Sequence, residues 1–73
     1  MAEIEVPSDI NGRVYRIEVA VGTAVDAGDA LMVLESMKME IPVEAPRAGR
    51  VARILIAEAD NVFEGQVLAI LET

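Results

Sequence analysis

The sequence predicts an all-β domain of the sandwich or barrel class that is made of two similar halves. Residues 12–35 match residues 49–72 without a gap, and eleven of the 24 aligned positions are identical. Turn-forming Gly, Asn and Asp residues recur in both copies at intervals of roughly 8 to 12 residues, which is typical of short strands. A duplicated set of short strands therefore indicates two similar half-barrels in one small body.

Eight strands are expected, four in each half. In chain order they are 3–6, 13–19, 24–25, 30–36, 39–43, 50–56, 61–62 and 67–71. Most of their residues are aliphatic, which suits a half-buried pleated strand. The turns are expected at 9–12, 22, 28–29, 46–49, 60–61 and 65. Gly, Asn and Asp at these places can adopt the positive φ that tight turns require.

The long second strand of each half has an irregular apolar spacing. Ile17 and Val19 share one face of the strand, but Val14 lies three residues before Ile17 and would point the other way. The second half repeats this spacing at residues 51, 54 and 56. We therefore expect a bulge or sharp bend in both strands, at which each strand leaves one small sheet and joins the other.

A helical interpretation competes for residues 31–41, because Leu31, Leu34 and Ile41 fall near a 3.6-residue period together with Lys38. Such a helix would have to end before Pro42, and it would have no partner helix. The same leucine spacing recurs at residues 68 and 71, where there is no room for a helix. The repeat therefore favours strands here.

Composition excludes several classes of function. The chain has no Cys and no His, so it has no disulfide framework, no zinc cluster of the usual ligands and no imidazole chemistry. Its net charge of −7 leaves no cationic stripe for nucleic acid. No apolar run reaches the length of a membrane span, and the first residues lack the features of a signal peptide. We expect a cytoplasmic protein that binds neither nucleic acid nor membrane.

Lys38 stands where the two copies differ. It would align with position 75, which lies beyond Thr73 at the end of the sequence. The repeat therefore predicts that only the first copy turns through Met37 and Lys38, in a hairpin that projects away from the termini. An isolated lysine is commonly a solvated charge, but Met37 and Met39 at an exposed tip are typical of a recognition surface.

The neighbours of Lys38 bear on its chemistry. A free lysine is almost entirely protonated at neutral pH, and nucleophilic lysines are activated by burial or by a nearby positive charge. Glu35 and Glu40 would instead favour the ammonium form. We therefore expect Lys38 to be a substrate that accepts an acyl group from another enzyme, with no catalytic role of its own.

The segment Glu35-Ser36-Met37-Lys38-Met39-Glu40 resembles the attachment motif of biotinyl domains, in which biotin is joined to the lysine of a Met-Lys-Met hairpin tip. The resemblance covers nearly the whole chain, as one carrier domain at residues 1–73. Its further positions are Gly12-x-Val14, Val25-x-x-Gly28, Leu31, Ala45-Pro46-x-x-Gly49-x-Val51, Val62-x-x-Gly65 and Leu68. It implies a flattened barrel-sandwich of two four-stranded antiparallel sheets related by a quasi-twofold axis.

The resemblance, which is to short biotin/lipoyl attachment proteins and biotin carboxyl carrier domains, also implies a function without catalytic or metal-binding residues. A biotin protein ligase would transfer biotin to Lys38, and a biotin carboxylase would carboxylate it. The carrier would then swing carboxybiotin to a carboxyltransferase. Met37 and Met39 would be recognised by the ligase, while Glu35, Ser36 and Glu40 would shape the hairpin.

Several features qualify the resemblance. Lipoyl domains usually carry Asp-Lys-Ala at the tip, so the methionines favour biotin over lipoate. The alternatives are a lipoyl carrier of a 2-oxo-acid dehydrogenase or glycine cleavage system, and an unmodified interaction module.

The gapless repeat leaves no space for the thumb loop of some carboxylase carriers. Ser36 stands where many biotinyl domains have Ala. Ala59 replaces the Gly22 of the first copy, so its turn is expected to differ in shape.

Overall fold

The computed structural model describes residues 2–73, so Met1, the first residue of the predicted domain, lies outside the described residues. This part of the chain forms eight strands and no helix. The strands are β1 (Glu3–Pro7), β2 (Gly12–Ile17), β3 (Ala24–Val25), β4 (Ala30–Ser36), β5 (Met39–Glu44), β6 (Gly49–Ile54), β7 (Asn61–Val62) and β8 (Val67–Glu72). All eight expected strands are present, and the helical interpretation of residues 31–41 is wrong.

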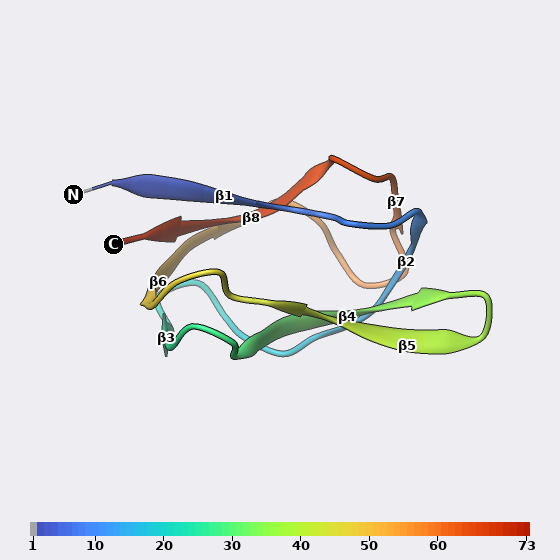
Figure 1. The fold of residues 1–73 in the computed structure, drawn as a ribbon, viewed down its shortest axis with the longest axis horizontal. Helices are drawn as coiled ribbons and strands as arrows, with labels where there is room; N and C mark the ends of the chain where they lie inside the picture. Colours follow the sequence, from blue (N-terminus) through green and yellow to red (C-terminus); the bar gives the residue numbers. More distant parts are fainter. Residues whose placement is uncertain (1) are drawn as a thin grey trace.

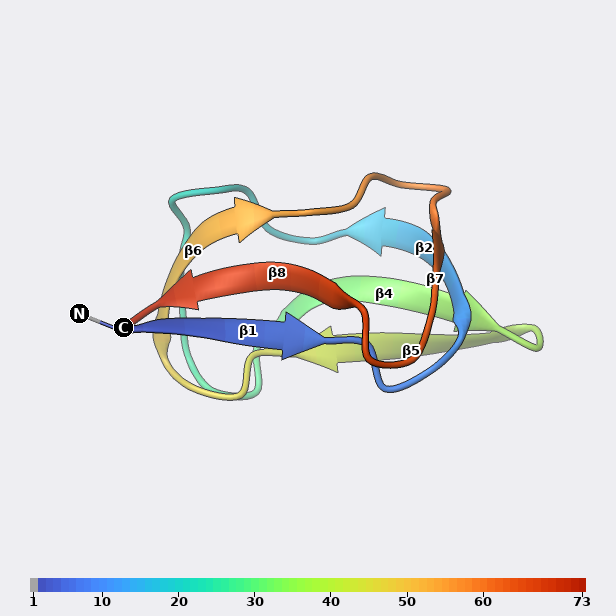
Figure 2. The same ribbon diagram turned by 90° about the horizontal axis from the view of Figure 1, so that it is seen from above.

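The strands form two four-stranded antiparallel sheets, with the orders β1-β8-β6-β3 and β5-β4-β2-β7. Figure 1 shows β1 and β8 in the upper layer and β4 and β5 in the lower layer, and Figure 2 shows the same layers from above. The body is elongated, with extents of 36 × 18 × 17 Å. The expected flattened barrel-sandwich is therefore confirmed.

The second sheet repeats the first strand for strand. β5, β4, β2 and β7 take the places that β1, β8, β6 and β3 take in the other sheet. The repeat also includes the first strand, because Glu3-Ile4-x-Val6 matches Glu40-Ile41-x-Val43 at the same offset. The short strand β3 of the first half pairs with β6, and β7 of the second half pairs with β2. Each sheet thus contains strands of both halves.

The predicted bulges are present in both copies. The β2–β4 register shifts between Val14 and Arg16, and the β6–β8 register shifts between Val51 and Arg53. The expectation that these strands change sheets is wrong, since β2 and β6 each stay in one sheet. The extra residue of a bulge bends and twists its strand, and here the bend is absorbed within the sheet.

β2 and β6 also end two residues earlier than expected, at Ile17 and Ile54. Beyond these ends a single hydrogen bond continues each pairing. The N–H of Glu18 donates to the carbonyl of Leu31 at 3.0 Å, and that of Leu55 donates to Leu68 at 2.9 Å. The chain then leaves the ladder for the turn that follows.

The core between the sheets is aliphatic and is built from equivalent pairs. These pairs are Val14 with Val51, Val25 with Val62, Leu31 with Leu68, and Leu34 with Leu71, and all eight residues are buried. Tyr15 and Phe63, the two aromatic residues, are both exposed. The fold therefore depends on tight packing of small and medium side chains, for which truncation of one buried leucine costs about 2–5 kcal/mol.

The expectation that the turn at Ala59 differs in shape from the turn at Gly22 is wrong. Its φ is 75°, close to the 96° of Gly22 at the equivalent place. The N–H of Ala59 donates to the carbonyl of Val14 at 2.8 Å, and the N–H of Gly22 donates to Val51 at the same distance. The two turns therefore share one shape, and Ala59 accepts the left-handed conformation that costs an L-residue about 1–2 kcal/mol.

Candidate cofactor attachment site

The candidate site is the tip of the β4–β5 hairpin, which projects from the body at the end opposite the two termini (Figure 1). The two strands are paired from Ala30 and Glu44 out to Ser36 and Met39. Only Met37 and Lys38 lie between the last paired residues. The turn therefore has the shortest length that commonly joins two antiparallel strands. The predicted position of Lys38 at a hairpin tip is confirmed.

Both residues of the turn have a left-handed backbone, with φ of 52° at Met37 and 65° at Lys38. Positive φ at both central residues is the mark of a type I′ turn, whose twist matches that of the flanking strands. Asn and Gly are the residues that usually fill it, and each L-residue with a Cβ costs about 1–2 kcal/mol there. The pairing of β4 with β5 holds a turn that its own two residues do not favour.

The side chains of the tip face solvent. Lys38 is exposed, Met37 is 93% exposed and Met39 is 62% exposed. Lys38 is the only lysine of the sequence. Within residues 2–73 its ammonium group takes part in none of the ion pairs or side-chain hydrogen bonds. Its amine is therefore open to another enzyme, between two apolar side chains that the same enzyme could contact.

The base of the hairpin is braced by charged residues of β2. Glu35 of β4 lies between Arg13 of β2 and Glu40 of β5 in the sheet register. The Arg13 guanidinium donates to the Glu35 carboxylate at 3.4 Å, which offsets the repulsion between two glutamates directly opposite each other. A hydrogen bond to Glu18 raises the pKa of Arg16, and the charge of Glu40 raises it more weakly.

Gly12 fits tightly against the same strand. A Cβ atom at Gly12 would lie 2.7 Å from the backbone carbonyl oxygen of Glu35, closer than such atoms can approach. The absence of a side chain therefore lets β2 pack directly beside the hairpin base. Gly49 has the same relation to the carbonyl oxygen of Glu72 in the other sheet, also at 2.7 Å.

The structure thus gathers all six site residues predicted from the sequence into one hairpin. Glu35 pairs with Glu40, Ser36 pairs with Met39, and Met37 and Lys38 form the turn. The contribution of Arg13 was not predicted. The recurrence of Arg13 and Glu35 as Arg50 and Glu72 was a signal, but only the first pair forms a salt bridge. Arg50 instead donates to the carbonyl of Gly22 at 2.6 Å.

Residues 2–73 contain no group of three or more Cys, Asp or Glu residues placed to hold a metal ion. They also contain no helix that could span a membrane.

Comparison with known proteins gives a consistent result. A family model described as "Biotin-requiring enzyme" matches residues 2–71. A biotinylated protein TB7.3 homolog of Mycobacterium leprae is 39% identical over 71 residues, which cover 97% of this chain and 99% of that protein. The urea amidolyase of Saccharomyces cerevisiae is 36% identical over 72 residues, or 99% of this chain.

The same likeness holds between structures. The urea carboxylase of Kluyveromyces lactis superposes on 99% of this chain with a TM-score of 0.93 and 33% sequence identity. This chain corresponds to only 6% of that protein and to 4% of the yeast urea amidolyase. It therefore matches one small part of the large relatives and nearly all of the small one.

Proposed function

Because the chain belongs to the family described as biotin-requiring enzymes, we propose that it is a biotin carboxyl carrier with biotin joined to Lys38. The observation that carries this proposal is the placement of the only lysine in a left-handed two-residue turn, exposed between two methionines. The deprotonated Nζ of Lys38 would attack the carboxyl carbon of a biotinyl-adenylate supplied by the ligase, so that the amide bond forms as AMP leaves and one positive charge is lost from the tip.

The residues at the tip fit such a group. An acyl group on Nζ needs an exposed amine free of ion pairs, and within residues 2–73 Lys38 is exposed, makes no ion pair and is held by the paired strands β4 and β5. When bound, biotin supplies the carbon dioxide carrying chemistry that no side chain of this family provides. The chain's own part is to present the lysine on a firm hairpin and to hold Met37 and Met39 beside it for recognition by the ligase.

The carrier is proposed to be non-catalytic and to visit other proteins for each step. A biotin protein ligase would modify Lys38, a biotin carboxylase would load the arm, and a carboxyltransferase would unload it. The relatives named urea amidolyase and urea carboxylase support this arrangement, because a segment like the present chain is part of each.

The test is biotin incorporation during co-expression with a biotin protein ligase. Intact-protein mass spectrometry should show a gain of one biotinyl group, and peptide mapping should place it on Lys38. The matched control is Lys38→Arg, which keeps the charge and should gain nothing. If a known acceptor domain in the same cells is biotinylated and this chain is not, the proposal is wrong. A gain of one lipoyl group would instead identify a lipoyl carrier.

A further inference from the structure

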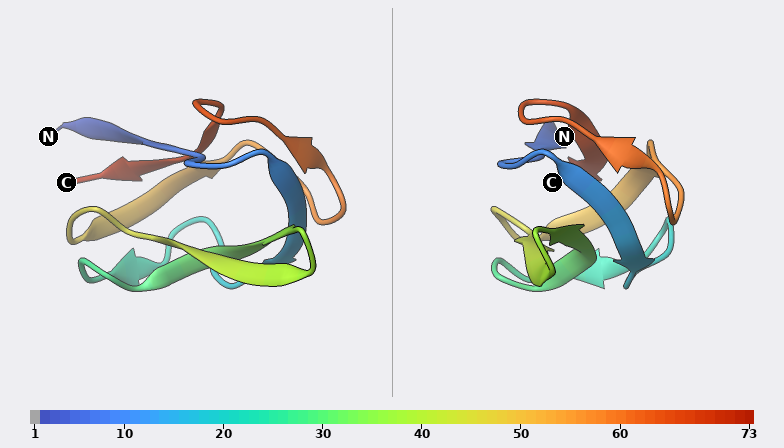
Figure 3. Two further views of the ribbon diagram at one scale, coloured as in Figure 1. Left: turned by 45° about the vertical axis from the view of Figure 1, so that its right-hand side comes forward. Right: turned by 90° about the vertical axis from the view of Figure 1, so that its right-hand side faces the viewer.

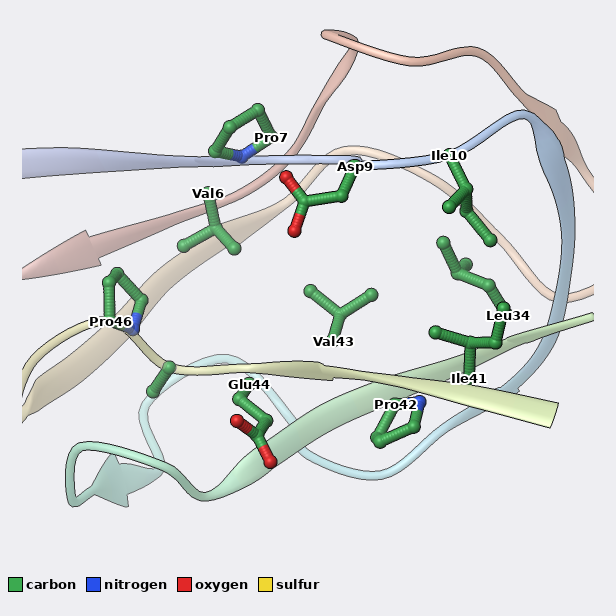
Figure 4. Close-up of a pocket in the computed structure, with 11 residues that line it drawn as sticks. Val6, Pro7, Asp9, Ile10, Leu34, Ile41, Pro42, Val43, Glu44 and Pro46 are labelled. Carbon is green, nitrogen blue, oxygen red and sulfur yellow. The ribbon is translucent and has the colours of Figure 1, made fainter.

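A groove of about 370 Å³ lies between β1 and β5, the edge strands of the two sheets, outside the attachment site (Figure 4). Its lining is mainly aliphatic and proline side chains from both strands and their loops. The lining residues are Val6, Pro7, Asp9, Ile10, Leu34, Ile41, Pro42, Val43, Glu44, Ala45 and Pro46. The two views of Figure 3 show the two layers to which these strands belong.

The edges of this groove are poorly suited to an added β-strand. Pro7 ends β1 and Pro42 lies in the middle of β5, and a proline has no N–H to donate to a neighbouring strand. The side-chain lining, in contrast, offers a half-buried apolar floor at Ile10, Ile41 and Val43. The groove is therefore better suited to a compact group on a flexible tether than to an extended peptide.

The groove departs from the internal symmetry in one direction. Val6 and Val43 are equivalent residues, and both line it, so it lies across the quasi-twofold axis. Ile41 also lines it, whereas its equivalent Ile4 does not. At the end nearer the hairpin its wall is Ile10, whose equivalent at the other end is the exposed Arg47. The groove therefore extends toward Lys38 and away from the chain termini.

The length of a biotinylated lysine matches this placement. Ile41 follows Lys38 by three residues of β5, which is about 10 Å at the rise of an extended strand. A lysine side chain carrying the acyl chain of biotin spans roughly 14 Å when extended, at bond lengths of about 1.5 Å. We propose that the groove between β1 and β5 holds the ring of the biotin attached to Lys38 while the ring is uncharged. This inference rests on the proposed function.

The charges at the groove specify which state of the ring it holds. Asp9 and Glu44 are its only charged lining residues, and neither forms an ion pair within residues 2–73. Figure 4 shows the Asp9 carboxylate facing the groove, where it can accept hydrogen bonds from the N–H groups of an uncharged ureido ring, and the Glu44 side chain pointing away on the other side of β5. A ring that carries an added carboxylate would lose one of these donors and be repelled by Asp9. Loading would therefore release the arm toward solvent.

The test compares amide NMR spectra of the chain with three states of Lys38: unmodified, biotinylated and hexanoylated. Biotinylation should shift the amide signals of Ile10, Ile41 and Val43, and hexanoylation, which adds a tail without a ring, should leave these signals in place. If biotinylation shifts only residues 36–39, or if the hexanoyl tail produces the same groove shifts, the inference is overturned.

A second measurement uses the rate of streptavidin capture. A ring held in the groove for part of the time is captured more slowly in proportion to its free fraction. The variant Ile10→Arg copies the other end of the molecule and should make capture about two- to fivefold faster. The Asp9→Asn variant should also speed capture, because it removes the carboxylate that accepts hydrogen bonds from the ring. Equal rates in the native chain and in both variants would overturn the inference.

The two proposals can fail separately. Because Lys38 is the only lysine, an active ester of biotin can modify it chemically even if no ligase does, with the terminal amine as the one competing amine. Failure of the ligase reaction alone would therefore refute the proposed function and leave the groove measurable. Normal ligase modification without groove shifts would refute only the groove. Thermal melting of Ile10→Arg confirms that the variant is folded before either comparison.

Discussion

The β4–β5 pair and the β8–β1 pair are two copies of one structure that finish differently. In the first, Ser36 pairs with Met39 and the two-residue turn joins them. In the second, Thr73 takes the place of Ser36 and Ala2 that of Met39. The N–H of Thr73 donates to the carbonyl of Ala2 at 2.9 Å, so the pairing reaches the same point without a turn. What separates the two ends is therefore the turn and the side chains on it, because the backbone pairing is common to both.

The ion pairs beside these two strand pairs also differ. Arg13 bridges Glu35 beside the turn, while its equivalent Arg50 binds the carbonyl of Gly22 and leaves Glu72 without this partner. Arg53 of β6 instead approaches Glu3 of β1 at 3.6 Å, across the intervening β8. These exposed pairs contribute little to stability. The two ends thus differ in the strands that the ion pairs join. At the hairpin base an arginine of β2 binds a glutamate of the neighbouring β4, whereas at the end with the termini an arginine of β6 approaches a glutamate of the edge strand β1.

The largest expected effect is on biotin incorporation, when the lysine is moved from the hairpin tip to the end of the body that carries the termini. Lys38→Arg should abolish biotin incorporation by the ligase and leave the melting temperature unchanged, because the side chain is exposed and makes no ion pair or side-chain hydrogen bond within residues 2–73. Adding Thr73→Lys to this variant should not restore incorporation, since that end lacks the left-handed turn and the methionines. Incorporation at residue 73, measured by peptide mapping, would show that the ligase needs only an exposed lysine.

Equivalent core leucines should show that the two halves are equal in packing. Leu34→Ala and Leu71→Ala each remove a side chain that is at most 1% exposed, and each should cost about 2–5 kcal/mol in the free energy of unfolding. Urea denaturation monitored by circular dichroism measures both. If the two losses in free energy of unfolding differ by more than the experimental error, one sheet contributes more to stability than the other.

Substitution of the equivalent Gly12 and Gly49 should distinguish an effect on stability from an effect on biotinylation. Gly12→Ala and Gly49→Ala each force a Cβ to within 2.7 Å of a backbone carbonyl, and each should cost about 1–3 kcal/mol. Only Gly12→Ala should also slow ligase modification, because the displaced carbonyl belongs to Glu35 at the hairpin base. Both variants are compared by melting temperature and by initial rate of biotinylation. Equal slowing in the two would argue that lost stability alone controls modification.

The smallest effect is expected at the left-handed turns. Ala59→Gly should relieve an unfavourable φ of 75° and stabilise the fold by a few tenths of a kcal/mol, after the greater freedom of glycine in the unfolded chain is subtracted. Gly22→Ala should have the opposite sign and a similar size. Thermal melting of both proteins in one buffer measures the difference, and two changes of the same sign would contradict the equivalence of these turns.

Much of the fold could be predicted because it is written twice in the sequence. Each strand, bulge and glycine turn appears at a constant offset, so the second copy confirms the first. Whether β2 and β6 remain in one sheet or cross to the other was harder to predict. The spacing of Val14 and Ile17 reveals a bulge but not the direction of the bend that follows. The sheet exchange of β3 and β7 also depends on contacts between the halves, which no local pattern records.

The candidate site was predicted less evenly. Lys38 at a hairpin tip followed from the repeat, but the positive φ of Met37 and Lys38 did not, because neither residue favours that conformation and neither signals it in a sequence. The groove was also not predicted. It depends on a difference between Ile10 and Arg47, two residues that matter only once β1 and β5 are known to lie opposite each other.

The pairing of Ala2 with Thr73 makes the backbone a circuit with a single cut. One residue added between Thr73 and Met1 would close the chain into a ring of two matching arcs, each ending in a two-residue turn. Opening such a ring at the turn between β3 and β4 would give a permuted chain with two hairpin tips, one at each end of the body. If both turns of such a chain carried Met-Lys, it would present two acceptor lysines on the same fold.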